Sequence, residues 1–503
     1  MTEFDAVVVG SGPNGLAGAI TLAGAGRRVL LVEGAEEFGG GLRSFTLDGA
    51  VCDMCATVLP LTRASKAFRD LDLDIEWAEP EVQAAHPLDG QAAVLVYRDE
   101  DQTERGLGSS HDARAWSATV GATARAGTPL SDTLLAPHNA PRAPLQAARF
   151  GALGILSATT LAGTTFAGQR AKAAFAGMAA HSMLDLGAPV TAGYGLLLAG
   201  LAHSVGWPLA RGGSQRLAEA LLAKFRELGG TAETGRPVTS LDDIPKTPVT
   251  LMDVTPRQLL AIAGDRMPDR YREKLARFRY GPGVFKLDWV LSGPVPWTDP
   301  EVSKAATVHL GGTLEEIAAA EAAVAGGRHP ERPFVLAVQP CAADPDRAPE
   351  GKHVLWAYCH VPNGSRTDMT RPVEDQIERF APGFRDLIVA SVAHGPAELE
   401  KHNPNLVGGD ISGGSAGLTQ FVTRTMLRPD PWAPPLPGVY LCSASTPPGP
   451  GAHGMGGYHA ARRALRQRQL RRKRVGGGTF WTALARGSNP RNPDIGFFTG
   501  GNR

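Results

Sequence analysis

The sequence is short of cysteine and of net charge. Its 503 residues include only five cysteines, an odd and sparse set that argues against a disulfide-stapled scaffold and fits a reducing compartment. The 51 Lys and Arg residues almost cancel the 50 Asp and Glu residues, so the net charge of +1 gives no general reason to expect nucleic acid as a partner. No signal-peptide pattern precedes residues 4–9, which already read as a buried strand. We therefore expect a cytoplasmic protein.

Charged side chains are missing from two long stretches, residues 150–169 and 186–210. By count, each stretch could cross a bilayer. The first, however, contains Gly, Ser, Thr and Gln, and the second is broken by Pro189 and carries His203. These residues favour buried or cavity-lining helices over transmembrane spans, which leaves only peripheral membrane contact open. No spacing of Cys and His predicts a metal site.

The first 33 residues contain a β-α-β pattern. Residues 4–9 are a short apolar run, residues 16–25 have a helical pattern that ends at Gly26, and residues 28–33 read as a second strand. A unit of this length is typical of a parallel sheet. It predicts an α/β protein with a Rossmann-type dinucleotide-binding domain, and the chain is long enough for at least one further lobe.

The turn between this strand and helix reads GSGPNG over residues 10–15. Gly10 permits the tight turn, Gly12 lets the backbone approach a pyrophosphate, and Gly15 lets helix and strand pack closely. The helix N-terminus offers free N–H groups and the positive end of its dipole to the phosphates. Glu33 ends the next strand, where an acid can accept hydrogen bonds from ribose hydroxyls.

A second glycine run, GGGLR over residues 39–43, and a closing segment over residues 440–457 favour FAD over NAD. Arg43 can pair with pyrophosphate or reach the flavin edge. The closing segment reads as a strand, a long turn of small residues and a helix start, whose dipole would stabilise negative charge on reduced flavin. We predict noncovalently bound FAD. The predicted cofactor-binding residues are Gly10, Gly12, Pro13, Asn14, Gly15, Glu33, Gly40, Gly41, Arg43, Val238, Ser443, Ala444, Gly454, Met455 and Gly457.

Several further stretches carry a family resemblance. Besides residues 10–15 they are DMCA (53–56), GWP (206–208), RGGS (211–214), DVTP (253–256), YGPGVFK (280–286), NPN (403–405), GGD (408–410) and residues 443–457. Together they resemble the phytoene desaturase-like branch of the FAD-dependent amine oxidase superfamily, and more closely the pyridine nucleotide-disulfide oxidoreductase domain-containing protein 2 group. The resemblance implies noncovalent FAD, an apolar substrate lobe and C–C or C–N dehydrogenation. Carotene desaturases tend to have His-Pro-Gly where this chain has PPG (447–449), and Pro at His453, which weakens a carotenoid assignment.

Dinucleotide-type signals at both ends of the chain predict a split domain with an inserted lobe. The predicted FAD-binding domain, a two-dinucleotide-binding-domain type, combines residues 1–80, 205–290 and 400–470. The predicted α+β substrate lobe combines residues 81–204 and 291–399, and residues 81–208 read as mostly helical and irregular. Residues 471–503 read as a poorly ordered basic and Gly-rich tail.

Lys286 and His453 are the candidate catalytic residues. Lys286 lies in an apolar strand; related amine oxidases use such a Lys to hold a water near flavin N5, and the alternative is an ion pair with Asp288. His453 lies in the predicted flavin turn, where it could exchange a proton near the ring or bond to backbone. The CxxC spacing at Cys52 and Cys55 allows a dithiol relay, but structural or cavity-lining thiols fit their context better.

Taken together, the sequence predicts an FAD-dependent oxidoreductase that dehydrogenates a lipophilic small molecule, such as an isoprenoid, by hydride transfer to flavin N5. Residues 150–210 are predicted to line a tunnel to the flavin, and the alternative is plain helix packing around a small closed site. Bulky replacements at Gly195 or Ala199 are expected to block turnover if these positions face the tunnel. One alternative is a flavin-binding protein with a regulatory or protein-interaction role, and a second is amine oxidase-type C–N oxidation. The electron acceptor stays open among oxygen, a quinone and NAD(P).

Overall fold

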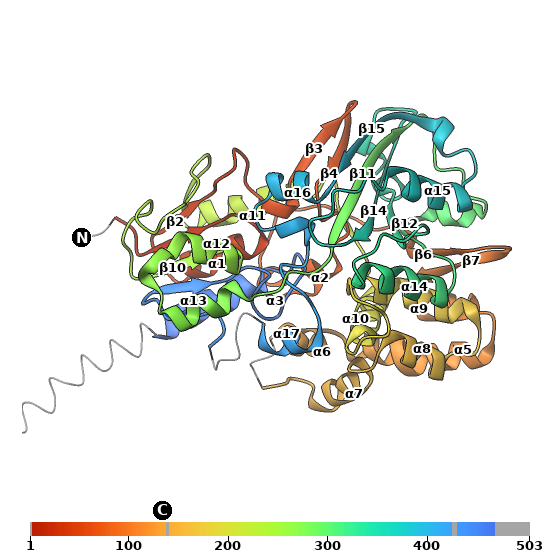
Figure 1. Cartoon of the computed structure of the whole chain (residues 1–503), viewed down its shortest axis with the longest axis horizontal. Coiled ribbons are helices and arrows are strands. Elements are labelled where there is room, and N and C mark those ends of the chain that lie inside the picture. The colour runs from red at the N-terminus through yellow and green to blue at the C-terminus, as the bar shows by residue number, and fades with distance from the viewer. Residues whose placement is uncertain (1–2, 137–139, 425–429, 468–503) are drawn as a thin grey trace, which may run out of the picture.

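Two sheets define two lobes (Figure 1). The structure, a computed structural model, describes residues 3–136, 140–424 and 430–467. A five-stranded sheet lies at the left of the view and a seven-stranded sheet at the right. The tail predicted over residues 471–503 lies outside the described residues.

The five-stranded sheet is wholly parallel, in the order β16-β10-β1-β2-β9. Its strands are β1 (Ala6–Val9), β2 (Val29–Val32), β9 (Thr231–Glu233), β10 (Thr250–Met252) and β16 (Val439–Leu441). The helices that cover it are α1 (Pro13–Gly24), α11 (Gln215–Glu227), α12 (Pro256–Ala263) and α13 (Asp269–Ala276). Val8 and Leu31 pack with α1 and α11, whereas Val7 and Leu30 pack with α12 and α13. Burial on both faces explains why β1 and β2 are short, continuous apolar runs, whereas the edge strand β9 is partly exposed and polar.

The seven-stranded sheet has the order β15-β11-β14-β13-β12-β6-β7, and only the β12–β6 pair is parallel. Its strands are β6 (Val82–Leu88), β7 (Gln91–Tyr97), β11 (Gly283–Leu291), β12 (Ala305–Leu310), β13 (Val335–Val338), β14 (His353–Val361) and β15 (Ile388–His394). The domain boundary predicted at residue 290 therefore falls inside β11, a strand that pairs entirely within this sheet.

The expectation that residues 81–208 are mostly helical is wrong at their start. Strands β6 and β7 form an antiparallel hairpin. The turn residues Asp89 and Gly90 lie between two runs rich in Val, Ala and Leu, and Gly90 adopts a φ of 64° that suits such a turn. An Asp-Gly pair between apolar runs is a strong hairpin signal, and here it outweighs the helix propensity of the alanines.

Helices pack beneath the seven-stranded sheet in the view of Figure 1, with α15 on its other side. They are α4 (Glu100–Arg105), α5 (Ser110–Trp116), α6 (Ala122–Leu134), α7 (Pro144–Gly154), α8 (Ala158–Thr165), α9 (Gln169–Ala180), α10 (Thr191–Ser204), α14 (Leu314–Ala325) and, opposite, α15 (Thr370–Phe380). The two charge-free stretches thus fold into several short helices. None of the helices in the described part of the chain is long and apolar enough to cross a membrane.

Shorter elements connect the lobes. They are β3 (Ser44–Leu47), β4 (Ala50–Asp53), α2 (Pro60–Ala64), α3 (Lys66–Arg69), β5 (Trp77–Ala78), β8 (Leu209–Ala210), α16 (Pro396–His402) and α17 (Leu418–Thr423). The last described helix begins at Met455, close to the helix start predicted at Gly457.

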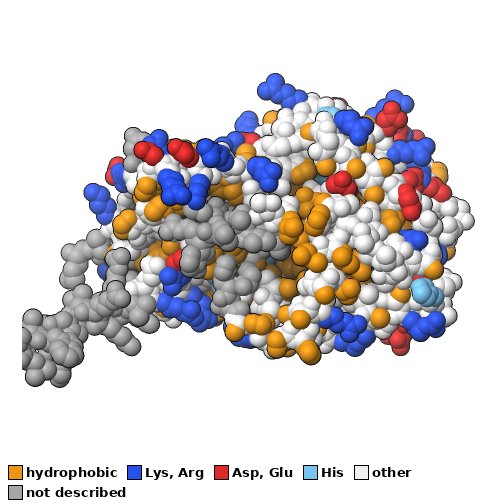
Figure 2. All heavy atoms as spheres, turned by 60° about the horizontal axis from the view of Figure 1, so that its bottom comes forward, with side chains coloured by type: hydrophobic (Ala, Val, Ile, Leu, Met, Phe, Trp, Pro, Cys, Tyr) orange, Lys and Arg blue, Asp and Glu red, His pale blue; other side chains and the backbone are white. Residues whose placement is uncertain are grey.

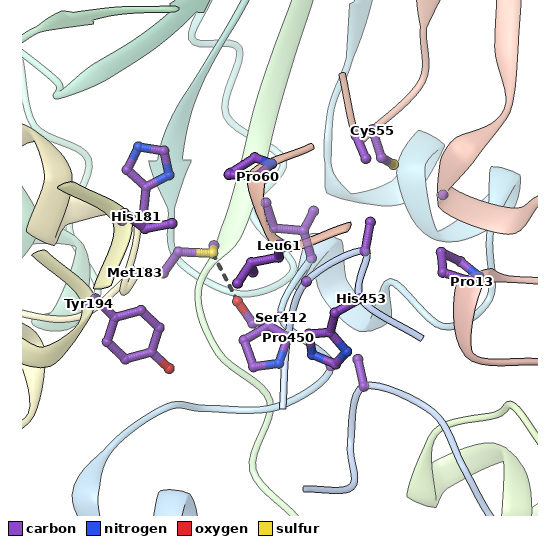
Figure 3. Close-up of a pocket in the computed structure, with 18 of the residues that line it drawn as sticks. Pro13, Cys55, Pro60, Leu61, His181, Met183, Tyr194, Ser412, Pro450 and His453 are labelled. Carbon is purple, nitrogen blue, oxygen red and sulfur yellow. Dashed lines mark hydrogen bonds between the residues drawn. The ribbon is translucent and has the colours of Figure 1, made fainter. Parts of the chain in front are cut away.

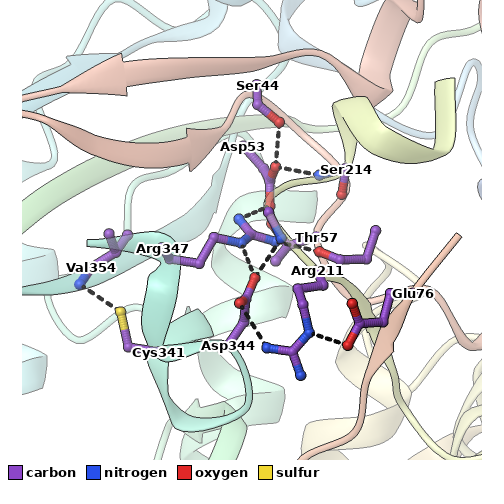
Figure 4. A network of polar contacts seen from close by, with 12 residues as sticks. Ser44, Asp53, Thr57, Glu76, Arg211, Ser214, Cys341, Asp344, Arg347 and Val354 are labelled. Carbon is purple, nitrogen blue, oxygen red and sulfur yellow. Dashed lines mark hydrogen bonds and ion pairs between the residues drawn. The ribbon is translucent and has the colours of Figure 1, made fainter. Parts of the chain in front are cut away.

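A fully buried ion-pair network joins the lobes (Figure 4). The Arg347 guanidinium donates to Asp53 Oδ2 at 2.8 Å and to Asp344 Oδ2 at 2.9 Å, and all three side chains are 0% exposed. Asp53 also accepts hydrogen bonds from the Ser44 hydroxyl and the Ser214 amide. Burying charged groups costs a large desolvation free energy, which is offset only when the charges are paired and hydrogen-bonded. Asp53 ends β4 and Ser214 precedes α11, so the network fixes the cofactor-side elements against the loop that carries Arg347.

Candidate functional site

The glycine turn over residues 10–15 leaves no room for side chains. A β-carbon at Gly12 would lie 2.9 Å from the Asp253 carboxylate, and one at Gly15 would lie 1.9 Å from the Gly10 carbonyl oxygen. Gly10 itself adopts a φ of 93°. The N-cap residue of α1, Gly12, has no side chain to cap the helix, Pro13 opens it, and the Gly15 amide is engaged by the Asp253 carboxylate. The N-terminus of the helix can therefore bind an anion through backbone N–H groups and the positive end of its dipole, as the sequence predicts.

Glu33 is fixed beside this turn. Its carboxylate accepts hydrogen bonds from the Ser11 amide at 2.8 Å, the Ser11 hydroxyl at 2.5 Å and the Ala35 amide at 3.0 Å. The Arg236 amide donates to the Glu33 carbonyl, which brings the half-buried Val238 close to the same end of the sheet. The carboxylate is thus held at the C-terminal end of β2, where a ribose would pass, and its predicted role stays a prediction.

The second glycine run packs directly on the first. A β-carbon at Gly40 would lie 3.0 Å from the Cα of Gly12. Arg43 donates from Nε to the Gly40 carbonyl at 3.1 Å and from its terminal nitrogen to the His402 carbonyl at 2.7 Å. Both partners are neutral carbonyls, and no carboxylate in the described part of the chain pairs with Arg43. Its positive charge is therefore free to attract an anion at this turn.

The two ends of the chain meet at this site. The Gly456 amide donates to Asn14 Oδ1 at 3.1 Å, and a β-carbon at Gly457 would lie 1.7 Å from the Asn14 carbonyl oxygen. Gly454 is less tight but also has no room for a side chain, since the Phe68 ring and Ala17, the latter at 2.8 Å, crowd the position of its absent β-carbon. Gly454 and Gly457 therefore serve the packing of the last helix on α1. This close contact is what the predicted split domain requires.

A cavity of about 740 Å³ joins the turn to the second lobe (Figure 3). Pro13 and Cys55 lie at one side of it, and His181 and Tyr194 lie at the other. The predicted residues that line it are Gly12, Pro13, Asn14, Gly41, Ser443, Ala444, Lys286 and His453. The predicted residues outside its lining are Gly10, Gly15, Glu33, Gly40, Arg43, Val238, Gly454, Met455 and Gly457.

The walls of the cavity are mostly apolar. One wall is the seven-stranded sheet, through Leu336, Val338 and Trp356, and the opposite wall includes α7 and α10. Ile155 and Leu418 line the cavity and are 54% and 40% exposed, so the cavity reaches the surface beside α7 and α17. Figure 2 shows hydrophobic side chains gathered on this face of the molecule.

Gly195 and Ala199, the two positions suggested to face a tunnel, do not line the cavity. Ala199 is fully buried in the helical core, and a β-carbon at Gly195 would lie 2.8 Å from the Phe175 ring. The face of α10 that lines the cavity carries Gly193, Tyr194, Leu197 and Leu198. Residues four apart share a helix face, so Gly195 and Ala199 lie together on the other one. Because α10 is apolar all round, its sequence holds no amphipathic signal to tell these faces apart.

Lys286 forms the predicted ion pair with Asp288 and lines the cavity, and its catalytic role stays a prediction. Its amino group lines the cavity and also donates to both carboxylate oxygens of Asp288, at 2.5 Å to Oδ1. It lies 5.1 Å from the centre of the Trp356 ring. Burial raises the pKa of Asp288, and the charge of Lys286 opposes that rise. The pair thus places one compensated positive charge in an apolar wall.

His453 is buried in the cavity wall as a neutral imidazole. Burial lowers its pKa to about 4, against the opposing effect of nearby backbone carbonyls. Its Nδ1 accepts a hydrogen bond from the Met455 amide at 3.1 Å, so the ring proton resides on Nε2. Nε2 has no hydrogen-bond partner among the described residues. A buried donor of this kind can bond to a group that enters the cavity.

The CxxC pair does not have the properties of a reactive dithiol. All five cysteines of the described chain are free thiols. Burial raises the pKa of Cys52 to about 12 and that of Cys55 to about 11. Both thiols are protonated near neutrality, whereas exchange needs a thiolate. Cys55 lines the cavity, and Cys52 packs in the core between the β3–β4 hairpin and the large sheet.

Asp253 is a site residue that the sequence analysis missed. Its Oδ2 accepts the Gly15 amide at 2.9 Å, and its side chain lines the cavity. Burial, with a smaller contribution from the negative charge of Glu33, raises its pKa to about 7, against the opposing effect of the hydrogen bond from the Gly15 amide. Asp253 directly follows β10, next to β1 in a parallel sheet, and the carboxyl ends of such neighbouring strands are where ligands bind. That position is the signal that could have found it.

The arrangement of both lobes is found in solved structures. The structure of putrescine oxidase bound to putrescine matches this chain with a TM-score of 0.60 at 15% identity, covering 92% of this chain and 98% of that one. The chain has the fold of the FAD-dependent oxidoreductases. A family model described as an NAD(P)-binding Rossmann-like domain matches residues 8–72 of this flavin-type oxidoreductase fold, which include both glycine runs.

Relatives in sequence agree with the predicted resemblance. The chain is 28% identical over 228 residues to pyridine nucleotide-disulfide oxidoreductase domain-containing protein 2 of Rattus norvegicus. That match covers 42% of this chain and 39% of the rat protein, so the chain aligns with about two fifths of this relative's length. It is 32% identical over 130 residues to 4,4'-diapolycopen-4-al dehydrogenase of Metabacillus indicus, covering 24% of this chain and 25% of that protein. The predicted resemblance is confirmed.

Proposed function

We propose that the protein is an FAD-dependent oxidoreductase that dehydrogenates a lipophilic small molecule by hydride transfer to flavin N5. The observation that carries this proposal is the single cavity that joins the dinucleotide turn to an apolar chamber between α10 and the large sheet. A pocket of this size, lined by apolar side chains with few polar groups, is typical of small-molecule sites. Its size and enclosure favour an enzyme over the alternative of a regulatory flavin-binding protein.

The residues of the turn fit FAD. The N-terminus of α1 and Gly12 would hold the pyrophosphate, and Glu33 would accept hydrogen bonds from ribose hydroxyls. Arg43 would balance the phosphate charge. His453 would donate from Nε2 to a carbonyl or nitrogen of the ring. When bound, the flavin supplies the hydride acceptor, and the surrounding residues orient the substrate and exclude water.

The charge of the cavity separates the two candidate substrate classes. The charged side chains among the described lining residues are Asp253, at the turn, and Lys286, paired with Asp288. An ammonium substrate would meet the positive Lys286 and, apart from Asp253 at the turn, would find no carboxylate without a cation among the described lining residues. We therefore favour a neutral apolar substrate over C–N oxidation of an amine, although the fold is shared with putrescine oxidase.

Anaerobic titration of the purified protein tests this function. The protein should be yellow and should release FAD on denaturation. Addition of apolar substrates such as isoprenoids should bleach the flavin absorbance band, whereas diamines should not. Oxygen, quinones and NAD(P) are then offered to the reduced protein to identify the acceptor. Protein that is colourless and cannot be reconstituted with FAD refutes the proposal, and bleaching by diamines alone would establish the amine oxidase alternative.

A further inference from the structure

The end of the cavity away from the dinucleotide turn contains buried polar groups that the proposed function does not use. Thr307 of β12 is 1% exposed and lines the cavity, and its hydroxyl has no hydrogen-bond partner among the described residues. His181, just after α9, lines the same chamber. An unpaired hydroxyl buried in an apolar wall costs free energy unless a ligand satisfies it.

Thr57 adds a second hydroxyl to this wall. It is buried, lines the cavity and accepts a hydrogen bond from Trp356 Nε1 at 3.0 Å. Its own proton donates to no described residue. Thr307 and Trp356 lie in one row of the sheet, since each is paired in register with Val338 of the strand between them. Hydrogen-bonding capacity is therefore concentrated on one part of an otherwise apolar wall.

His181 can serve as either a donor or an acceptor. Its Nε2 lies 3.0 Å from Nε2 of His309, and the rings meet edge to face. Burial lowers the pKa of His181 to about 3 and that of His309 well below its ordinary value, so both rings are neutral and share one proton between these nitrogens. If His181 donates to His309, its Nδ1 accepts from a ligand; if it accepts, its Nδ1–H donates.

These groups do not form a metal site or a charged subsite. No group of three or more His, Cys, Asp and Glu side chains in the described residues is arranged to hold a metal ion. Lys286, the one Lys or Arg among the described residues that line the cavity, is already paired with Asp288. A carboxylate or an ammonium would therefore lack a counter-ion here, whereas a neutral oxygen needs only the hydrogen bonds that Thr307 and His181 offer.

We propose that this end of the cavity binds a neutral oxygen function, an alcohol, aldehyde or ketone, on an otherwise apolar substrate, with Thr307 and His181 as its hydrogen-bonding partners. This inference rests on the proposed function and narrows its substrate class to neutral oxygen-bearing lipophiles. The apolar part of such a molecule would lie along α10 and Leu336, and the oxygen would fix its depth relative to the dinucleotide turn.

Binding of three probes of equal chain length tests the inference without turnover. Decane, 1-decanol and decanoate are titrated against FAD-loaded protein, and the change in intrinsic tryptophan fluorescence is the readout, because Trp207 and Trp356 lie in the cavity wall. Thr307→Val should weaken 1-decanol about tenfold and leave decane unchanged, because one buried hydrogen bond is lost. Thr307→Ser is the matched control and should restore the affinity for 1-decanol. Decanoate should bind more weakly than 1-decanol near neutral pH.

The melting temperature of Thr307→Val shows whether weaker binding of 1-decanol results from a destabilised fold. Thr307→Val removes an unpaired hydroxyl at nearly constant volume, so its melting temperature should equal or exceed that of the wild type. A lower melting temperature, equal effects on decane and 1-decanol, or no binding of 1-decanol would each overturn the inference. If isoprenoid hydrocarbons nevertheless bleach the flavin, the inference about the oxygen function is refuted and the proposed function is retained. If the protein takes up no FAD, the proposed function itself is refuted.

Discussion

Asp253→Asn should stabilise the apo-protein, and by more at high pH than at low pH. Burial raises the pKa of Asp253 to about 7 from an ordinary value of 3.8. The folded state therefore binds a proton that the unfolded state has released between these values, and stability falls as pH rises through this window. Asparagine keeps an oxygen that can accept the Gly15 amide but carries no charge.

The size of the effect follows from the shift. Between pH 5.5 and pH 7 the wild type should lose about 2 kcal/mol of unfolding free energy through this group, at roughly 1.4 kcal/mol per pH unit, and little more above pH 7. The advantage of Asp253→Asn over the wild type should therefore be about 2 kcal/mol larger at pH 8 than at pH 5.5. Urea unfolding of both apo-proteins at these two pH values measures it.

The same carboxyl should govern cofactor affinity. A phosphate bound at the turn would add negative charge near Asp253 and favour its protonated form. FAD affinity of the wild type should then fall as pH rises above 7, whereas that of Asp253→Asn should change less. Identical pH dependence of the two proteins in both assays would refute the reasoning, because the carboxylate would then be ionised throughout despite its burial.

Three further outcomes are expected. Gly12→Val should yield colourless protein, since even its β-carbon would lie 2.9 Å from Asp253 Oδ2 and its side chain would fill the phosphate position; yellow protein would contradict this. Leu197→Trp should block turnover of a large substrate and leave the flavin spectrum unchanged, whereas the exposed Ala148→Trp should do neither, and equal activity of both would show that α10 does not line the substrate path. Arg347→Met should lower the unfolding free energy by about 3–5 kcal/mol in urea, because Asp53 is left buried without its cation and Asp344 keeps only its longer ion pair with Arg211; a loss below about 1 kcal/mol would mean that water reaches these carboxylates.

The parts of the fold that sequence could predict are those with local, redundant signals. The apolar runs of β1 and β2, the glycine turn between them and Glu33 lie within 33 residues and fix the start of the parallel sheet. The closing segment carries an equally dense run of small residues, so the meeting of both chain ends could be anticipated. In these segments the small residue types are required by local steric constraints, which do not depend on the rest of the chain.

The parts that sequence could not predict depend on tertiary contacts. The lining face of α10 is set by its neighbours, because its own pattern is apolar on every side. β11 reads as one apolar strand, but nothing local says which sheet it joins. The role of Asp253 arises from its adjacency to a turn more than two hundred residues earlier in the chain. Local propensity carries no information about such pairings.

The contact between the two ends of the chain also determines when the site can be completed during folding. The hydrogen bond from Gly456 to Asn14 spans 442 positions, and β16 joins the parallel sheet at its edge only after nearly the whole described chain exists. Contacts of such sequence separation form late, since the loop between their partners must close first. During translation, the glycine turn over residues 10–15 is therefore synthesised long before residues 440–457, which pack against it. If the protein binds FAD as proposed, loading would follow the synthesis of residues 440–457, which contain the closing segment of the site.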